Sequence, residues 1–161
     1  MTTSTTPDVG QQAPEFRLKG PGGQFVSLSD FAGRQNVMLV FYPLAFSPVC
    51  SHQLPSIQKD LHQFEALNTA VFGVSVDSHY ANEAFARSLN LTFPLLSDFK
   101  REAMTAYGVL NAQAGYSGRA VFAIDKQGRI IHKDVAANPG DMAQVPSVDR
   151  VLQALRAVPQ T

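Results

Sequence analysis

Two continuous apolar stretches with a helical segment between them constrain this fold more than any other feature. Residues 37–42 read Val-Met-Leu-Val-Phe-Tyr, and residues 69–76 read Thr-Ala-Val-Phe-Gly-Val-Ser-Val. Short unbroken runs of β-forming residues predict strands that are covered on both faces. The apolar positions between them recur every three or four residues, at Leu54, Ile57, Leu61 and Phe64. Strand, helix and strand in this order predict a βαβ unit with parallel strands.

Further elements extend this unit at both ends. The segments expected to be extended are 15–19, 24–28, 120–125 and 129–135. The segments expected to be helical are 80–90, 100–107 and 148–157. The first extended pair flanks a turn rich in glycine and proline, and the second pair forms a hairpin around Gly128. Together they predict an α/β protein with a thioredoxin-like fold: a central mixed sheet flanked by helices, with extra N-terminal strands.

Length and charge exclude several classes of protein. The 161 residues suit one domain, and we expect a flexible lead-in over 1–12 and a single thioredoxin-like domain over 13–161. Thirteen basic and thirteen acidic residues cancel, so we expect neither nucleic acid nor an anionic membrane as a partner. The N-terminus lacks the apolar core of a secretory signal, and the longest apolar stretch, 37–46, is too short to span a bilayer. We therefore expect a cytoplasmic protein.

The single cysteine, Cys50, lies where the first buried strand passes into the following helix. One cysteine excludes an intrachain disulfide, a C-x-x-C redox pair and an iron–sulfur cluster. Ser47 and Pro48 suit the N-cap and first helical positions, which places Cys50 in the first turn. Backbone N–H groups and the positive end of the helix dipole favour a thiolate there. The alternative is an inert thiol that packs as a small hydrophobe.

Pro55 lies further along the same predicted helix, where it removes the usual donor to the Ser51 carbonyl. We therefore predict a kink that partly decouples the first turn from the rest of the helix. The four histidines show no metal-ligand spacing, so the sequence predicts neither a metal nor another cofactor.

The residues around Cys50 resemble the active-site motif of the peroxiredoxin family, Pro-x-x-x-Thr/Ser-x-x-Cys. Here the motif reads Pro43-x-x-x-Ser47-x-x-Cys50. Similar blocks run through nearly the whole chain, at 9–16, 26–31, 93–98, 106–109 and 118–122. The sequence Pro-Leu-Ala-Phe at residues 43–46 and the single cysteine most resemble the one-cysteine, alkyl-hydroperoxide-reductase-E-like branch of this family.

This resemblance implies a role for five side chains. Cys50 would attack the peroxide as a thiolate, Ser47 would hold the peroxide through its hydroxyl, and Arg119 would stabilise the thiolate and the developing oxygen charge. Pro43 would shield the sulfur from water, and Gln53 would orient the arginine. Without the resemblance, Ser47 is equally a helix cap and Pro43 a strand terminator. Arg119 is then an ordinary charge at a strand start, and Gln53 a solvent-facing helix residue.

The resemblance implies a thiol-dependent peroxidase that reduces hydrogen peroxide and organic hydroperoxides through a sulfenic acid at Cys50. Because the chain has no second cysteine, an external thiol would regenerate Cys50: thioredoxin, a glutaredoxin-like protein or a low-molecular-weight thiol. A homodimer is also implied, with Phe46 as a candidate contact. Two alternatives stay open, a peroxide-sensing relay to a partner protein and a non-catalytic thioredoxin-like binding module.

Overall fold

A mixed sheet of seven strands forms the centre of the protein, in the order β2-β1-β5-β4-β3-β8-β9. The computed structural model describes residues 6–137 and 146–158. The strands of this sheet are β1 (Arg17–Lys19), β2 (Phe25–Ser27), β3 (Asn36–Phe41), β4 (Thr69–Ser75), β5 (Leu95–Ser97), β8 (Ala120–Ile124) and β9 (Ile130–Val135). β3, β4 and β5 are parallel, whereas β8 pairs with β3 antiparallel. The predicted βαβ unit and mixed sheet are confirmed.

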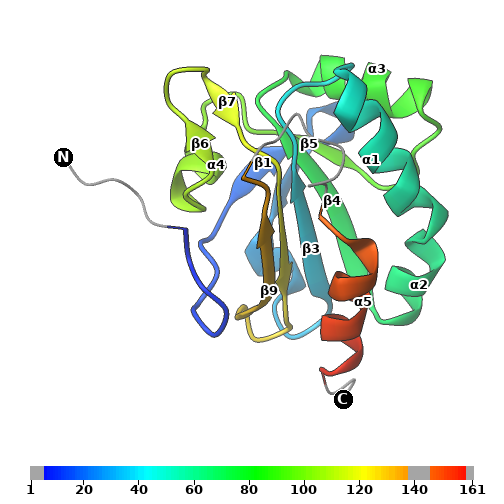
Figure 1. Ribbon diagram of the computed structural model, residues 1–161, viewed down its shortest axis with the longest axis vertical. Coiled ribbons are helices and arrows are strands. Elements are labelled where there is room, and N and C mark those ends of the chain that lie inside the picture. Colours follow the sequence, from blue (N-terminus) through cyan, green and yellow to red (C-terminus); the bar gives the residue numbers. More distant parts are fainter. Residues whose placement is uncertain (1–5, 138–145, 159–161) are drawn as a thin grey trace.

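The helices lie on the two faces of this sheet (Figure 1). They are α1 (Pro48–Lys59), α2 (Leu61–Ala66), α3 (His79–Ser88), α4 (Glu102–Ala106) and α5 (Val148–Arg156). Short 3-10 turns occupy Pro21–Gly23 and Leu28–Phe31, and a separate small ribbon joins β6 (Leu110–Asn111) to β7 (Tyr116–Ser117).

Alternate residues of β3 contribute to two separate hydrophobic cores, because successive side chains of a strand point to opposite faces. Met38 and Val40 pack in one core with apolar residues of α1, α2, α3 and α5. Val37 and Leu39 pack in the other with α4 and the N-terminal segment. All six residues of β3 are buried, as predicted for the apolar run that begins at Val37, and the polar Asn36 is buried with them.

The helical segment between β3 and β4 is divided, which differs from the continuous segment that the sequence suggests. Helix α1 ends at Lys59 and α2 begins at Leu61, because Asp60 has non-helical dihedrals of φ −103° and ψ 9°. Helix α1 runs through Pro55 as one element, and the kink there stays a prediction. Strand β5 was not predicted, since three residues are too few for a periodic pattern.

Part of the expected lead-in is attached to the sheet. The Gly10 N–H donates to the Ile130 carbonyl at 2.8 Å, and the Ile130 N–H donates to the Gln11 carbonyl at 2.9 Å. Residues 1–5 lie outside the described residues, and the boundary between a lead-in and the domain stays a prediction. Within 6–137 and 146–158, no helix combines the length and apolar character needed to cross a membrane.

Gly73 in β4 lies too close to its neighbours for a larger side chain. A Cβ at this position would lie 2.5 Å from Leu95 Cδ2 and 3.1 Å from Tyr42 Cε1. We expect Gly73→Ala to lower the free energy of unfolding by about 1–3 kcal/mol, since overpacking forces neighbours out of their rotamers. Urea titration followed by circular dichroism measures this loss.

A double variant with Leu95→Ala is the control, because it removes the atom that the new Cβ would meet. The two substitutions together should destabilise the protein by less than the sum of their separate effects. Strictly additive effects would show that the contact between residues 73 and 95 is not the cause.

Candidate active site

Cys50 lies in the first turn of α1, as predicted, and its side chain is 0 % exposed. Pro48 occupies the first helical position and Cys50 the third. Its sulfur is therefore near backbone N–H groups that have no partner within the helix. The residue also belongs to the core between the sheet and α1, which separates the thiol from bulk water.

The Arg119 guanidinium lies directly beside this sulfur. Its Nη2 donates to Cys50 Sγ at 3.1 Å, and the arginine is 1 % exposed. The topology explains the contact: β8 is antiparallel to β3 and Phe41 pairs with Ala120, so the start of β8 lies beside the end of β3. A guanidinium keeps its charge at all ordinary pH values, so a positive charge lies against the sulfur in a site that excludes bulk water.

Gln53 follows Cys50 by three residues and therefore shares its face of α1. It is 2 % exposed, and its Oε1 accepts a hydrogen bond from Arg119 Nη1. Because arginine has only donors, the amide oxygen must be the atom that faces it. The solvent-facing alternative for Gln53 is therefore wrong. Two nitrogens of one guanidinium contact Gln53 and Cys50 separately.

Ser47 occupies the N-cap position of α1, but its hydroxyl does not cap the helix. The hydroxyl donates instead to the Leu44 carbonyl at 2.9 Å. The Ser47 carbonyl accepts from the Ser51 N–H at 3.0 Å. The interpretation of Ser47 as a side-chain cap is thus wrong, because its Oγ is turned back into the preceding loop. This hydroxyl keeps lone pairs that can accept a hydrogen bond.

Pro43 begins the loop between β3 and α1 and is half-buried. It directly follows Tyr42, whose side chain is fully buried. Proline has no N–H, so Pro43 adds only apolar surface and a carbonyl to the entrance of α1. The structure thus brings Arg119 and Gln53 into contact with each other around Cys50, and places Ser47 and Pro43 on the loop that precedes it.

Sequence reasoning missed a polar network beneath this loop. Tyr42 Oη donates to Asn82 Oδ1 at 2.6 Å, and Asn82 Nδ2 donates to the Leu96 carbonyl at 3.2 Å. Burial, above all, raises the pKa of Tyr42 well beyond its ordinary range, so the phenol stays a donor. Asp77 accepts from the Ala45 N–H at 2.7 Å. The sequence feature that could have indicated this network is Ser-Val-Asp-Ser at residues 75–78, where polar residues follow a buried strand.

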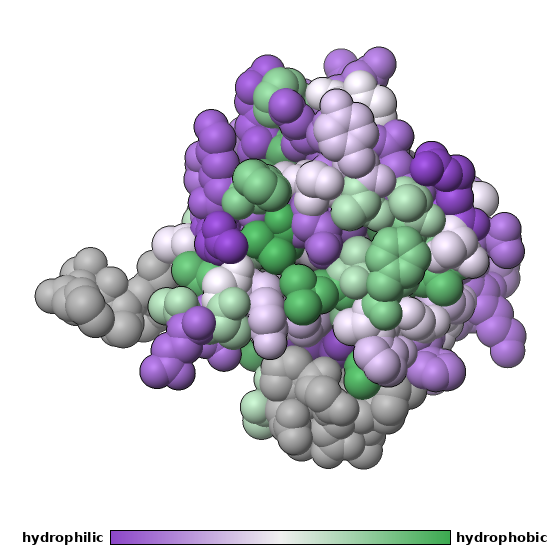
Figure 2. Space-filling view, turned by 90° about the horizontal axis from the view of Figure 1, so that it is seen from above, coloured by the Kyte–Doolittle hydropathy of each residue, from purple (hydrophilic) through white to green (hydrophobic). Residues whose placement is uncertain are grey.

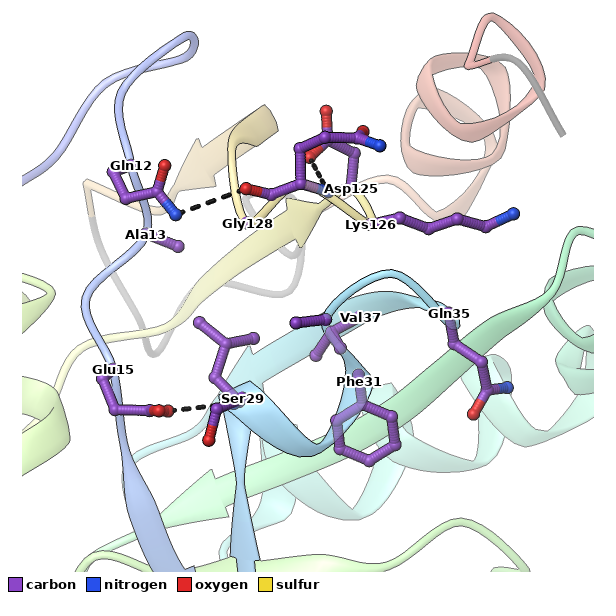
Figure 3. A pocket seen from close by; sticks show the side chains of 13 residues that line it. Gln12, Ala13, Glu15, Ser29, Phe31, Gln35, Val37, Asp125, Lys126 and Gly128 are labelled. Atoms are coloured by element: carbon purple, nitrogen blue, oxygen red, sulfur yellow. Dashed lines mark hydrogen bonds between the residues drawn. The ribbon is translucent and has the colours of Figure 1, made fainter. Parts of the chain in front are cut away.

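A cavity of about 190 Å³ lies at the other end of β3 (Figure 3). Val37 and Ala13 are among its apolar lining residues, and Glu15 and Lys126 among its polar ones. Glu15 Oε1 already accepts from the N–H groups of Phe16 and Ser29, at 3.0 and 3.2 Å. This cavity is separate from Cys50, which follows the opposite end of the strand.

Comparison with known proteins agrees with this geometry. The model of the AhpC/TSA family matches residues 9–133. Alkyl hydroperoxide reductase E of Mycobacterium tuberculosis is 37% identical over 152 residues, which cover 93% of this chain and 99% of that protein. The chloroplastic 2-Cys peroxiredoxin BAS1 of Arabidopsis thaliana is 36% identical over 94% of this chain and 60% of that protein.

Solved structures show the same fold. The reduced 2-Cys peroxiredoxin of Plasmodium vivax superposes with a TM-score of 0.82 at 32% identity, covering 92% of this chain and 94% of that one. Mycobacterium tuberculosis AhpC gives a TM-score of 0.82 at 29% identity, covering 95% and 93%. Two of these four relatives are named for two cysteines, whereas this chain has one. The thioredoxin-like fold is confirmed, and the chain belongs to the AhpC/TSA family of peroxiredoxins, which are thiol-dependent peroxidases.

Proposed function

We propose that this peroxidase acts on hydrogen peroxide and organic hydroperoxides through Cys50. The contact of 3.1 Å between Arg119 Nη2 and Cys50 Sγ carries this proposal. The thiolate attacks the nearer peroxide oxygen, an S–O bond forms and the O–O bond breaks. Cys50 becomes a sulfenic acid, and the departing oxygen takes a proton from solvent to leave as water or an alcohol. An inert binding module would not explain a buried cation against the sulfur.

Arg119 lowers the barrier because its charge is fixed where negative charge moves during the attack. That charge starts on sulfur and passes to the departing oxygen, and donors already in place cost no reorganisation. Gln53 holds the guanidinium through Nη1, which leaves Nη2 directed at the sulfur. A neutral amide orients the cation without cancelling its charge.

Ser47 and Pro43 complete the site from the loop. The Ser47 hydroxyl, now bonded to the Leu44 carbonyl, can accept from the peroxide O–H or rotate to donate to its oxygen. Pro43 shields the sulfur from water by presenting a surface without a donor. Both groups hold the two peroxide oxygens in line with the sulfur. This orientation lowers the entropic part of the activation barrier.

Regeneration requires a thiol from another molecule, because Cys50 is the only cysteine. That thiol attacks the Cys50 sulfenic acid, forms a mixed disulfide and releases water. Thioredoxin, a glutaredoxin-like protein and a low-molecular-weight thiol all supply this chemistry. A free thiol of this kind suits a reducing compartment, and we place the protein in the cytoplasm on that ground.

We also propose a homodimer formed at the end of the sheet where α1 begins. Exposed aromatic side chains follow the ends of the three parallel strands: Phe46 after β3, Tyr80 after β4 and Phe99 after β5. Parallel strands end at one edge of a sheet, so these groups share that edge. Figure 2, which views this end, shows hydrophobic side chains gathered near the middle of the face. A second copy would cover them.

Replacement of Cys50 tests the reaction. Cys50→Ser should reduce peroxide consumption to the uncatalysed rate, since a serine hydroxyl is a far weaker nucleophile than a thiolate. Stopped-flow mixing with one equivalent of hydrogen peroxide measures this. His52→Ala is the control, because His52 is exposed on α1 and should leave the rate unchanged. Consumption at the wild-type rate by Cys50→Ser would refute the role of Cys50.

Replacement of Arg119 tests the electrostatic argument. Arg119→Met should slow oxidation of Cys50 by about 100- to 1,000-fold, the usual effect of losing one preorganised donor to developing charge. Gln53→Leu should cause a smaller fall, because the guanidinium stays but loses its orienting acceptor. Equal rates in Arg119→Met and the unsubstituted protein would contradict the assignment. Circular dichroism checks that each variant is folded.

Sedimentation equilibrium tests the dimer. Phe46 is 57 % exposed, so Phe46→Ser should weaken self-association by at least about tenfold, as expected when a buried aromatic contact is removed. Phe25→Ser changes an exposed aromatic residue on the edge strand β2 and should have no such effect. A monomeric unsubstituted protein at micromolar concentration would rule out the interface.

A further inference from the structure

The loop of residues 43–47, which leads into α1, has a conformation that its own backbone does not favour. Phe46 has φ +69°, a left-handed value that residues with a side chain rarely adopt. The local hydrogen bond from the Ser47 N–H to the Leu44 carbonyl is long, at 3.4 Å. Such strain persists only where the surroundings impose it. The Ser47 hydroxyl also donates to the Leu44 carbonyl within the loop, at 2.9 Å. Neither bond is made by an atom of Ala45 or Phe46, so contacts that hold these two residues directly must come from outside the loop.

Two contacts from the β4–α3 region meet this requirement. The Ala45 N–H donates to Asp77 Oδ2 at 2.7 Å, and a bond to a charged acceptor is stronger than one between neutral groups. The Phe46 ring packs on Phe85 of α3, with 4.9 Å between ring centroids. Ala45 and Phe46 are adjacent, so both contacts act on the strained part of the loop.

Asp77 is itself held in place. Ser75 Oγ lies 2.8 Å from Asp77 Oδ2, and Ser75 is fully buried at the end of the central strand β4. The next residue, Ser78, caps α3 by accepting from the Ala81 N–H at 3.1 Å. The carboxylate therefore projects from a rigid junction between strand and helix and not from a free loop.

We infer that Asp77 is a positioning residue that holds the 43–47 loop closed over Cys50, and that it thereby favours oxidation of Cys50 over its reduction by external thiols. The inference rests on the proposed function. Oxidation uses the closed arrangement, in which the loop that carries Pro43 and Ser47 leads directly into the first turn of α1, where Cys50 lies. Asp77 acts through the Ala45 N–H and does not touch the reacting atoms.

Reduction has the opposite requirement. Cys50 is 0 % exposed in the closed arrangement, so an external sulfur has no path to it. The incoming thiolate must form an S–S bond as the S–O bond of the sulfenic acid breaks and water leaves. This needs the loop to open, and loss of the contact to Ala45 shifts the population toward the open state.

The test compares Asp77→Ala with Asp77→Asn. Alanine removes the acceptor, whereas asparagine keeps an amide oxygen at the end of a side chain of the same length. Stopped-flow kinetics give the rate constant for Cys50 oxidation by hydrogen peroxide. The absorbance of thionitrobenzoate gives the rate constant for capture of the preformed sulfenic acid by a thiol. Asp149→Ala, which removes an exposed carboxylate on α5, is the matched control.

We expect Asp77→Ala to slow oxidation about tenfold and to accelerate capture by the thiol several-fold, the size expected for one lost hydrogen bond. Asp77→Asn should bring both constants close to the wild-type values. Unchanged constants, or a parallel fall in both, would overturn the inference. Opposite shifts accompanied by loss of the native circular dichroism spectrum would also overturn it, because unfolding slows oxidation and exposes the sulfur as well. Failure of the unsubstituted protein to form a sulfenic acid would instead refute the proposed function.

Discussion

A guanidinium buried inside a protein must have acceptors, because an uncompensated charge in a water-poor site is very unfavourable. Arg119 is 1 % exposed, and Gln53 and Cys50 each accept one of its hydrogen bonds. A neutral thiol is a weak acceptor, whereas a thiolate is a strong one. A thiolate at Cys50 would therefore compensate the buried arginine better than a thiol. In the proposed reaction, the charge that folding has to accommodate is also the charge that stabilises the attack on peroxide.

This arrangement depends on the pairing of β8 with β3. The antiparallel register pairs Phe41 with Ala120. Arg119, the residue immediately before β8, therefore lies next to the loop that follows β3. A shift of one residue would turn the side chains of β8 to the opposite faces of the sheet. The apolar sequences of both strands, buried on each face, fix this register. Core packing thus determines the distance between the arginine and the sulfur.

The sequence was informative where local chemistry decides the structure. The strand ending near residue 42, the helix starting at Pro48 and the first-turn position of Cys50 all followed from short-range patterns. The contact between Arg119 and Cys50 joins residues 69 positions apart, and only the family resemblance indicated it. Ser47 occupies the predicted N-cap position, but its side chain makes no cap bond, because its hydroxyl donates to the Leu44 carbonyl instead, a local choice that a sequence pattern does not rank. Sequence reasoning did not identify Asp77, because its contact depends on where the Ala45 N–H points in the folded loop.

A peroxidase with one cysteine has to satisfy two opposing demands at one sulfur. Attack on peroxide gains from burial beside a cation, since low polarity strengthens every electrostatic contact. Regeneration needs the same sulfur to meet another molecule. A fully closed site would accumulate sulfenic acid and expose it to further oxidation, and a fully open one would lose the preorganised donors. The Ala45–Asp77 contact opposes the strain at Phe46, and we infer that it helps to set how readily the loop opens. The proposed reaction would then be controlled by the loop as well as by the residues that touch the sulfur.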